Sequence, residues 1–216
     1  CSEELWKNAL DLTTGLNEKQ LNELRLGWDL LLDIDCKFVE YSKIAAELIC
    51  QALKFHDIDN FGLKFSGGSG FHIGLSFEAF PKTLNNIKTS EFFPQGPRLI
   101  SAYLQEMISQ KLSEEILKIS TLQEISDYTK MPLNNLVENK NFNPFSLVKL
   151  DTILLAPRHL YRMAYSLNEK TGLASIVIKP EQLKNFHPGW ANPERITAKP
   201  FLPQAEKEEA KELMIQ

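Results

Sequence analysis

The sequence predicts an α/β protein of the α+β kind, in which strands form a sheet flanked by helices. Segments 28–35 (WDLLLDID) and 71–77 (FHIGLSF) are short and apolar, as buried strands are. Segments 38–56 and 98–119 repeat apolar residues at spacings of three and four, as amphipathic helices do. The chain has 216 residues, of which 43% are hydrophobic and 24% charged, and this composition excludes intrinsic disorder.

The remaining elements follow from shorter patterns. Segment 61–77 is predicted to be a β-hairpin, because the strand 61–66 leads into the turn 66–70 (SGGSG) and then into a second strand. Glycine fills three of these five turn positions and allows backbone angles that other residues avoid. The other predicted elements are short helices at 3–10, 17–26 and 121–129, a long loop at 131–145, strands at 147–155 and 172–179, an extended connector at 188–203 and a charged helix at 205–216.

We predict one domain over residues 1–203, with a helical insertion around 84–146, followed by a C-terminal charged helix over 204–216. The chain begins with Cys1 and not with Met, which indicates a fragment of a longer protein. Its apolar runs are shorter than the ~18 to 20 residues of a membrane helix, and its acidic start does not resemble a signal peptide. Three scattered cysteines without a CxxC pair predict reduced thiols and a cytoplasmic location.

The charge distribution limits the possible partners. The net charge of −4 excludes a general nucleic-acid coat protein, although a local basic face is compatible with it. Residues 1–50 carry five basic and ten acidic groups, whereas residues 158–199 carry seven basic and three acidic groups. This asymmetry is either chance surface variation or a weak indication of phosphate binding near 158–199.

The first candidate site is the acid pair Asp33 and Asp35 at the end of an apolar segment. On a strand, residues i and i+2 face the same side, so the two carboxylates would lie about 6 to 7 Å apart. Such a pair provides the oxygen ligands that Mg²⁺ prefers, and a bound cation would relieve the repulsion between the acids. The alternative is a strand end that leads into a solvated turn, where Asp is common.

The second candidate site is the glycine-rich turn and the residues that follow it. The backbone N–H groups of such a turn can approach phosphate oxygens, and Ser66 opens it. His72 lies between the apolar Phe71 and Ile73, so it should face away from the core, on the open face of the sheet. The alternatives are an ordinary turn and a structural histidine.

The third candidate site begins at Asp151 on a predicted strand and continues through 158–173 (RHLYRMAYSLNEKTGL). One carboxylate is followed by arginines, a histidine, a serine and a lysine within about twenty residues. This set suits a polyanion that carries metal ions, because the acid can bind the metal and the cations can bind phosphates. The alternative is a polar loop with a routine Lys-Thr-Gly turn.

Together and in this order, the three clusters resemble the motifs of the archaeo-eukaryotic primase superfamily, over residues of about 27 to 178. The family pattern is a strand ending in Asp-x-Asp, a small-residue turn leading to His, and a later strand Asp. In primase subunits, a His-Leu-x-Arg/Lys stretch and a Ser-x-His-x-Lys-Thr-Gly segment follow. Here these are DID (33–35), SGGSGFH (66–72), Asp151 and the segment 158–173.

The resemblance implies a primase-polymerase catalytic core with an RRM-like mixed sheet. It implies template-dependent nucleotidyl transfer, DNA primase or primase-polymerase activity, on a single-stranded DNA template and primer, with an accessory subunit or fused domains as further partners and a location at the nucleoid. Asp33, Asp35 and Asp151 would be catalytic and would bind two divalent ions, Mg²⁺ or Mn²⁺. The implied nucleotide-binding residues are Ser66, Gly67, Gly70, His72, His159, Arg162, Ser166, Asn168 and Lys170.

The chain departs from the family pattern at three places. Gly68 and Ser69 stand where primase turns often carry arginines, and Asn168 stands where the family often has His. Many primase subunits carry a zinc knob between the second and third motifs. Residues 73–150 contain neither Cys nor His, so no zinc is expected there. The chain therefore resembles a divergent primase-polymerase more than a replicative subunit.

Two other functions are compatible with parts of this pattern. A catalytically silent RRM-like module could bind nucleic acid, but it would not need three acids directed at one point. A two-metal nuclease would use the same carboxylates, but it would not need the Ser, His, Arg and Lys set for a triphosphate.

Overall fold

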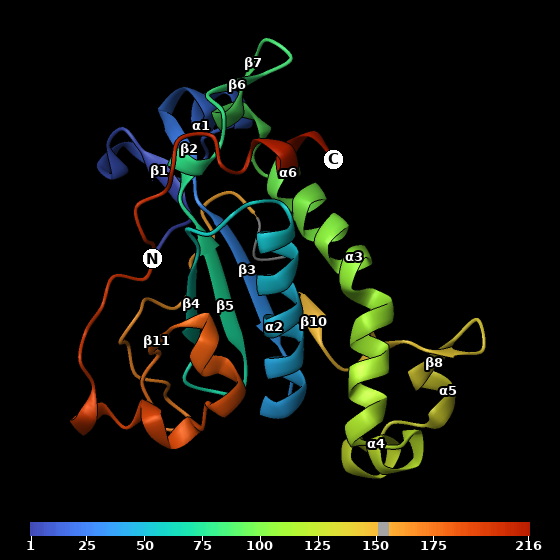
Figure 1. The fold of residues 1–216 in the computed structure, drawn as a ribbon. Coiled ribbons are helices and arrows are strands. Elements are labelled where there is room, and N and C mark those ends of the chain that lie inside the picture. The colour runs from blue at the N-terminus through green and yellow to red at the C-terminus, as the bar shows by residue number, and fades with distance from the viewer. Residues whose placement is uncertain (151–155) are drawn as a thin grey trace.

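The computed structural model describes residues 1–150 and 156–216, and it is built around one five-stranded sheet (Figure 1). The strand order in this sheet is β10-β3-β5-β4-β11. The strands are β1 (Glu4–Trp6), β2 (Arg25–Trp28), β3 (Leu30–Asp35), β4 (Gly62–Phe65), β5 (Phe71–Leu75), β6 (Thr83–Leu84), β7 (Ile87–Lys88), β8 (Val137–Glu138), β9 (Asn141–Phe142), β10 (Lys149–Leu150) and β11 (Val177–Ile178). The α-helices are α1 (Glu18–Leu24), α2 (Val39–Phe55), α3 (Gln95–Ile119), α4 (Leu122–Thr129), α5 (Leu133–Leu136) and α6 (Lys211–Ile215).

The central elements follow one another as β3-α2-β4-β5-α3-β10, which is a split βαβ arrangement. Every pairing in the five-stranded sheet is antiparallel in the described part of the chain. The expected mixed sheet is therefore wrong, whereas the α+β class is confirmed. The reason is that β5 returns between β3 and β4, so these two strands, which run in the same direction, are not neighbours.

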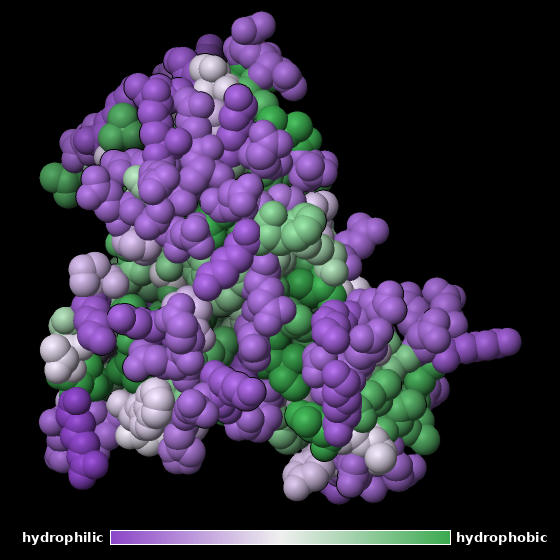
Figure 2. Space-filling model, in the orientation of Figure 1, coloured by the Kyte–Doolittle hydropathy of each residue, from purple (hydrophilic) through white to green (hydrophobic). Residues whose placement is uncertain are grey.

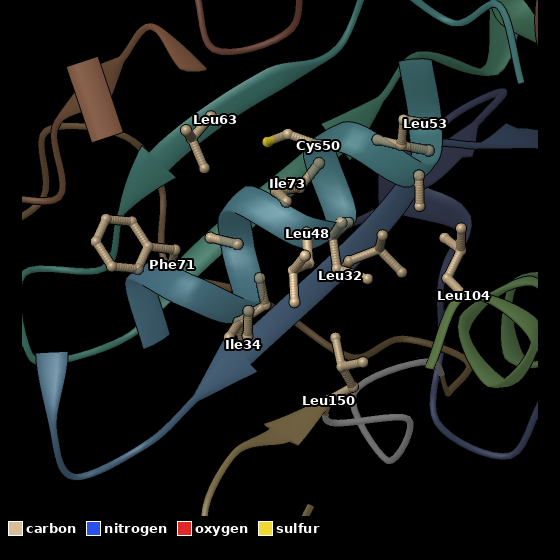
Figure 3. Packing of buried hydrophobic residues seen from close by; sticks show 14 of the residues in the cluster. Leu32, Ile34, Leu48, Cys50, Leu53, Leu63, Phe71, Ile73, Leu104 and Leu150 are labelled. Carbon is tan, nitrogen blue, oxygen red and sulfur yellow. The ribbon is translucent and has the colours of Figure 1, made fainter. Parts of the chain in front are cut away.

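One face of the sheet is covered by α2 and forms the hydrophobic core. The residues Leu32, Ile34, Phe71 and Ile73 alternate along β3 and β5 and point toward α2, as Figure 3 shows. The strands predicted at 28–35, 61–66 and 71–77 and the helix predicted at 38–56 are thus confirmed. Because side chains alternate along a strand, Asp33 and His72 lie on the opposite face.

The opposite face is partly covered by the chain segment that follows β11. A Cβ at Gly62 would lie 1.8 Å from the backbone oxygen of Phe201, and a Cβ at Gly74 would lie 2.6 Å from Leu202 Cδ2. Glycine at these two positions therefore lets the segment pack directly on β4 and β5. The expected connector 188–203 is extended only in part, because it contains the 3₁₀ turns Pro188–Ala191 and Pro193–Arg195.

The N-terminal region differs from the prediction. Residues 3–10 were expected to be helical, but β1 pairs with β2, and a 3₁₀ turn follows at Ala9–Asp11. A buried ion pair, Arg25 Nη2 to Glu4 Oε1 at 2.7 Å, joins the two strands. This contact is between residues far apart in the sequence, so local periodicity could not predict it. The helix predicted at 17–26 forms as α1, which begins with a capping box at Asn17.

The insertion around 84–146 contains mainly helices. The helices predicted at 98–119 and 121–129 are present as α3 and α4. The predicted loop at 131–145 is not wholly irregular, since it contains α5 and the β8–β9 hairpin. Figure 2 shows a mainly hydrophilic surface, with hydrophobic side chains gathered around α4 and α5, where Leu133 is exposed.

The C-terminal helix is shorter than predicted. Only Lys211–Ile215 is α-helical, although a helix was expected over 205–216. Its Leu213 is 2% exposed and belongs to the hydrophobic core. In the described part of the chain, no helix combines the length and the hydropathy needed to span a membrane.

Candidate functional site

Three polar side chains form a row across the middle of the sheet, on the face opposite α2. In the strand register, Asp33 of β3 pairs with His72 of β5, and His72 pairs with Lys64 of β4. His72 Nε2 lies 3.5 Å from Asp33 Oδ1, and Lys64 Nζ lies 3.1 Å from His72 Nδ1. The row thus joins a carboxylate, an imidazole and an amine through adjacent strands, where backbone pairing fixes their spacing.

Lys64 is fully buried, at 0% exposure, and its polar contacts compensate this burial. Besides His72, its Nζ donates to the Arg162 backbone oxygen at 2.8 Å and to Ser175 Oγ at 3.1 Å. Burial lowers the pKa of Lys64 from 10.5 to about 7, with Arg162 acting in the same direction and Asp33 opposing it. Near neutral pH, the ammonium and amine forms of Lys64 therefore have similar populations, and the ammonium form predominates at lower pH.

His72 was expected on the open face of the sheet. It does lie on the face away from the core, but it is only 4% exposed, so the expected exposure is wrong. The reason is that the segment after residue 155 covers this part of the face, with the Tyr161 ring 6.3 Å from the His72 ring. Burial lowers the pKa of His72 well below its usual value, and the nearby charges of Lys64 and Arg162 act in the same direction. The ring is consequently neutral at pH 7.

The predicted acid pair lies where β3 ends. Asp33 is partly exposed, and Asp35 is exposed and pairs in register with Lys149 of β10. The third predicted acid, Asp151, lies outside the described residues. The two described carboxylates offer the oxygen ligands that Mg²⁺ and Mn²⁺ take, which fits the implied ions in ligand type. In the described ranges, however, no three His, Cys, Asp or Glu side chains are placed to hold a metal ion.

The turn 66–70 lies directly beside the end of β3. A Cβ at Gly70 would lie 2.3 Å from the Ile34 backbone oxygen, so only glycine permits this approach. Ser66 Oγ accepts hydrogen bonds from the backbone N–H groups of Gly68 and Gly70, each at 3.3 Å. The backbone N–H groups of this turn were expected to be available to phosphate, but here the Ser66 hydroxyl accepts from those of Gly68 and Gly70. Gly67 has a φ of 86°, which favours glycine at that turn position.

A second turn, at 168–172, packs against the first. Asn168 Oδ1 accepts from the backbone N–H groups of Lys170 and Thr171, and Thr171 Oγ1 donates to the Gly67 backbone oxygen. Asn168 therefore shapes its own turn, in the way that Asx turns do. The structure thus brings the predicted second cluster and the Lys-Thr-Gly segment together, although they are a hundred residues apart in the sequence.

The other predicted phosphate-binding residues lie around these turns and differ in their exposure and hydrogen-bond partners. The Arg162 guanidinium donates to the Leu167 backbone oxygen at 2.8 Å and to Glu169 Oε2 at 3.0 Å. Ser166 Oγ donates to the Met163 backbone oxygen at 2.7 Å. Lys170 is exposed, and His159 is half-buried in the turn after residue 155. Arg162 and Ser166 are thus engaged within their own segment, and the Lys170 side chain points to solvent.

Three residues of this site, Lys64, Tyr161 and Ser175, were not predicted from the sequence. Lys64 carried a detectable signal, because a charged residue inside an apolar strand (GLKF) must find buried partners. Ser175 and Tyr161 carried none, since their positions beside Lys64 depend on how the chain after residue 155 crosses the sheet. Ser175 is fully buried, and its Oγ donates to the Phe65 backbone oxygen at 2.9 Å.

A cavity of about 310 Å³ opens beside Asp35. It lies between the end of β3, the end of α4 and the start of β10. Its walls combine charged, hydroxyl and hydrophobic side chains. The lining residues are Asp35, Cys36, Lys37, Phe38, Thr129, Met131, Ser146, Leu147 and Lys149. The end of β3 that carries Asp33 and Asp35, called the acid edge below, therefore adjoins a cavity large enough for part of a small organic ligand.

Comparisons of the sequence with protein-family models and with curated proteins find no match. The site must therefore be judged by its geometry and chemistry.

Proposed function

We propose that this protein is a template-dependent nucleotidyltransferase of the primase-polymerase type, which makes or extends nucleic-acid chains from nucleoside triphosphates. The observation that carries the proposal is that the first two sequence clusters and the 168–172 part of the third meet beside the end of β3. The acids of β3, the turn 66–70 with His72, and the turn 168–172 lie together, and Thr171 bonds Gly67 directly. Phosphoryl-transfer sites need carboxylates beside phosphate-binding groups in this way.

The topology supports the same proposal. A four-stranded β10-β3-β5-β4 sheet with α2 and α3 in the crossovers is the βαββαβ order of an RRM-like core. The acid pair lies on the first strand of this unit and the histidine on the third, in direct register. This placement is what the resemblance to the archaeo-eukaryotic primase superfamily implies for its carboxylates and histidine.

In the proposed reaction, Asp33 and Asp35, together with Asp151, would hold two Mg²⁺ or Mn²⁺ ions. Such ions supply Lewis-acid activation of a hydroxyl and charge neutralisation of the leaving pyrophosphate. His72 would donate a hydrogen bond from Nε2 toward a phosphate oxygen near Asp33. Arg162 and Lys170 would bind the outer phosphates, once Arg162 exchanges Glu169 for the nucleotide.

Two alternative functions are less well supported by this geometry. A silent nucleic-acid-binding module would gain nothing from exposing Asp35 beside Asp33, because unneutralised acids repel a phosphate backbone. A two-metal nuclease would use the acids but has no need of a buried histidine and a second turn beside them. The predicted partners remain a single-stranded DNA template, a primer and nucleoside triphosphates, with the nucleoid as the proposed location.

The test is synthesis on a defined template. The protein is incubated with a single-stranded oligonucleotide, labelled nucleoside triphosphates and Mn²⁺ or Mg²⁺, with and without a primer. We expect labelled product that requires both template and metal ion. Shortening of the labelled template without product growth would indicate the nuclease, and binding without either reaction would indicate the silent module.

A further inference from the structure

We propose that Lys64 is a positioning residue for the nucleotide site, because its ammonium group fixes His72 with Nδ1 as acceptor and Nε2–H directed toward Asp33. This inference rests on the proposed function, since it assigns Lys64 to the same site. The residue is not part of the sequence pattern that suggested the site. It lies on β4, next to His72 and one strand removed from Asp33.

The hydrogen-bond partners of Lys64 determine how its protons are used. The backbone oxygen of Arg162, 2.8 Å from Nζ, can only accept. Ser175 Oγ gives its single proton to the Phe65 backbone oxygen, so it accepts from Nζ at 3.1 Å. Two of the three N–H groups of the ammonium are thereby assigned. The third faces His72 Nδ1 at 3.1 Å, which makes Nδ1 the acceptor.

The tautomer of His72 follows from this assignment. A neutral imidazole that accepts at Nδ1 carries its proton at Nε2. His72 Nε2 lies 3.5 Å from Asp33 Oδ1, on the side of the ring nearest the acid edge. His72 therefore presents a neutral N–H donor to this edge, where a metal-bound phosphate would lie under the proposed function.

Lys64 cannot itself contact a nucleotide. Its side chain is fully buried, its N–H groups have three partners, and its Nζ lies 5.7 Å and 5.3 Å from the rings of Tyr161 and Phe201. The aromatic rings favour the ammonium form by cation–π attraction. Lys64 therefore acts through His72. If Lys64 has a positioning role, its removal changes the tautomer of the His72 ring, whereas the loss of a merely structural lysine leaves that tautomer unchanged.

The first measurement is the tautomer of His72, from long-range ¹H–¹⁵N spectra of histidine-labelled protein at pH 6. His72→Asn identifies its signals among the four histidines. We expect an unprotonated Nδ1 and a protonated Nε2 in the wild type. In Lys64→Met we expect the proton to shift at least partly to Nδ1. Lys88→Met, on the separate β6–β7 hairpin, should change nothing. A wild-type Nδ1–H, or an unchanged tautomer in Lys64→Met, overturns the inference.

The second measurement is the nucleotide KM in the synthesis assay. Lys64→Met should raise it roughly tenfold, because a misoriented His72 loses one hydrogen bond to an anionic ligand. Lys88→Met should match the wild type. A shifted tautomer with unchanged KM and kcat overturns the positioning role. If the wild type makes no product, the proposed function fails, but the tautomer measurement still tests the contact between Lys64 and His72. If Lys64→Met does not fold, the wild-type spectrum alone shows whether Nδ1 of His72 is the acceptor.

Discussion

His72 and Asp33 face each other across β5 and β3, with Nε2 3.5 Å from Oδ1. Both residues belong to central strands of the sheet, so their spacing is fixed by backbone pairing and not by a loop. Sites built on strands hold their groups more precisely than sites built on loops. The residues of the 158–173 segment that are proposed to bind phosphate, by contrast, lie mostly in turns.

The ion pair between Arg162 and Glu169 predicts opposite effects of two substitutions. Arg162→Ala should raise the nucleotide KM by roughly ten- to a hundredfold, because a charge-assisted contact is lost. Glu169→Gln should lower the KM, because it frees the guanidinium from Glu169 Oε2, 3.0 Å away. Steady-state synthesis with varied nucleotide measures both, and template affinity serves as the control. Equal KM values in all three proteins would show that Arg162 is an ordinary surface residue.

Gly70→Ala should destabilise the protein strongly. The added Cβ would lie 2.3 Å from the Ile34 backbone oxygen, so β5 would have to move away from β3. We expect a loss of roughly 1 to 3 kcal/mol in the free energy of unfolding, measured by urea titration. Gly68→Ala is the matched control in the same turn. Its added Cβ would lie 3.3 Å from the side-chain atom Asn168 Nδ2, which can move, and not against a backbone atom. A stability of Gly70→Ala equal to that of Gly68→Ala would contradict the close approach.

Glu3 predicts a pH-dependent stability. It is 2% exposed, and its two carboxylate oxygens have no hydrogen-bond partner within residues 1–150 and 156–216. Burial raises the pKa of Glu3 from 4.5 to about 8, and the charges of Glu4 and Asp29 act in the same direction. Below pH 4.5 the group is protonated in both folded and unfolded protein. Between pH 4.5 and 8 the unfolded state alone loses the proton, so the folded state becomes progressively less stable as pH rises.

Glu3→Gln should therefore leave stability nearly unchanged at pH 4 and increase it at pH 8.5. The expected gain at pH 8.5 is on the order of 2 to 4 kcal/mol. Urea unfolding at the two pH values measures it, with Glu47→Gln on the exposed face of α2 as the control. An equal effect of Glu3→Gln at both pH values would mean that the pKa of Glu3 is the same in the folded and the unfolded protein.

The sequence predicted the parts of the fold that depend on local pattern. Alternation along 71–77 placed Phe71 and Ile73 in the core and His72 on the opposite face, and the structure has them there. It did not predict that His72 would be covered, because Tyr161 approaches it from a segment about ninety residues away. The strand β1 was missed for the same reason, since its pairing with β2 and the Glu4–Arg25 ion pair are long-range contacts. The roles assigned to the site residues remain predictions.

The proposed nucleotidyl transfer depends on Asp33 and Asp35 at the end of β3. The most direct measurement is primer extension on a defined template with Mn²⁺, comparing the wild type with the double variant Asp33→Asn, Asp35→Asn. Asp59→Asn, an exposed acid in the loop after α2, is the matched control. We expect extended product from the wild type and from Asp59→Asn, and none from the double variant, although all three show the same circular dichroism and cooperative unfolding. Undiminished extension by the folded double variant would contradict the account.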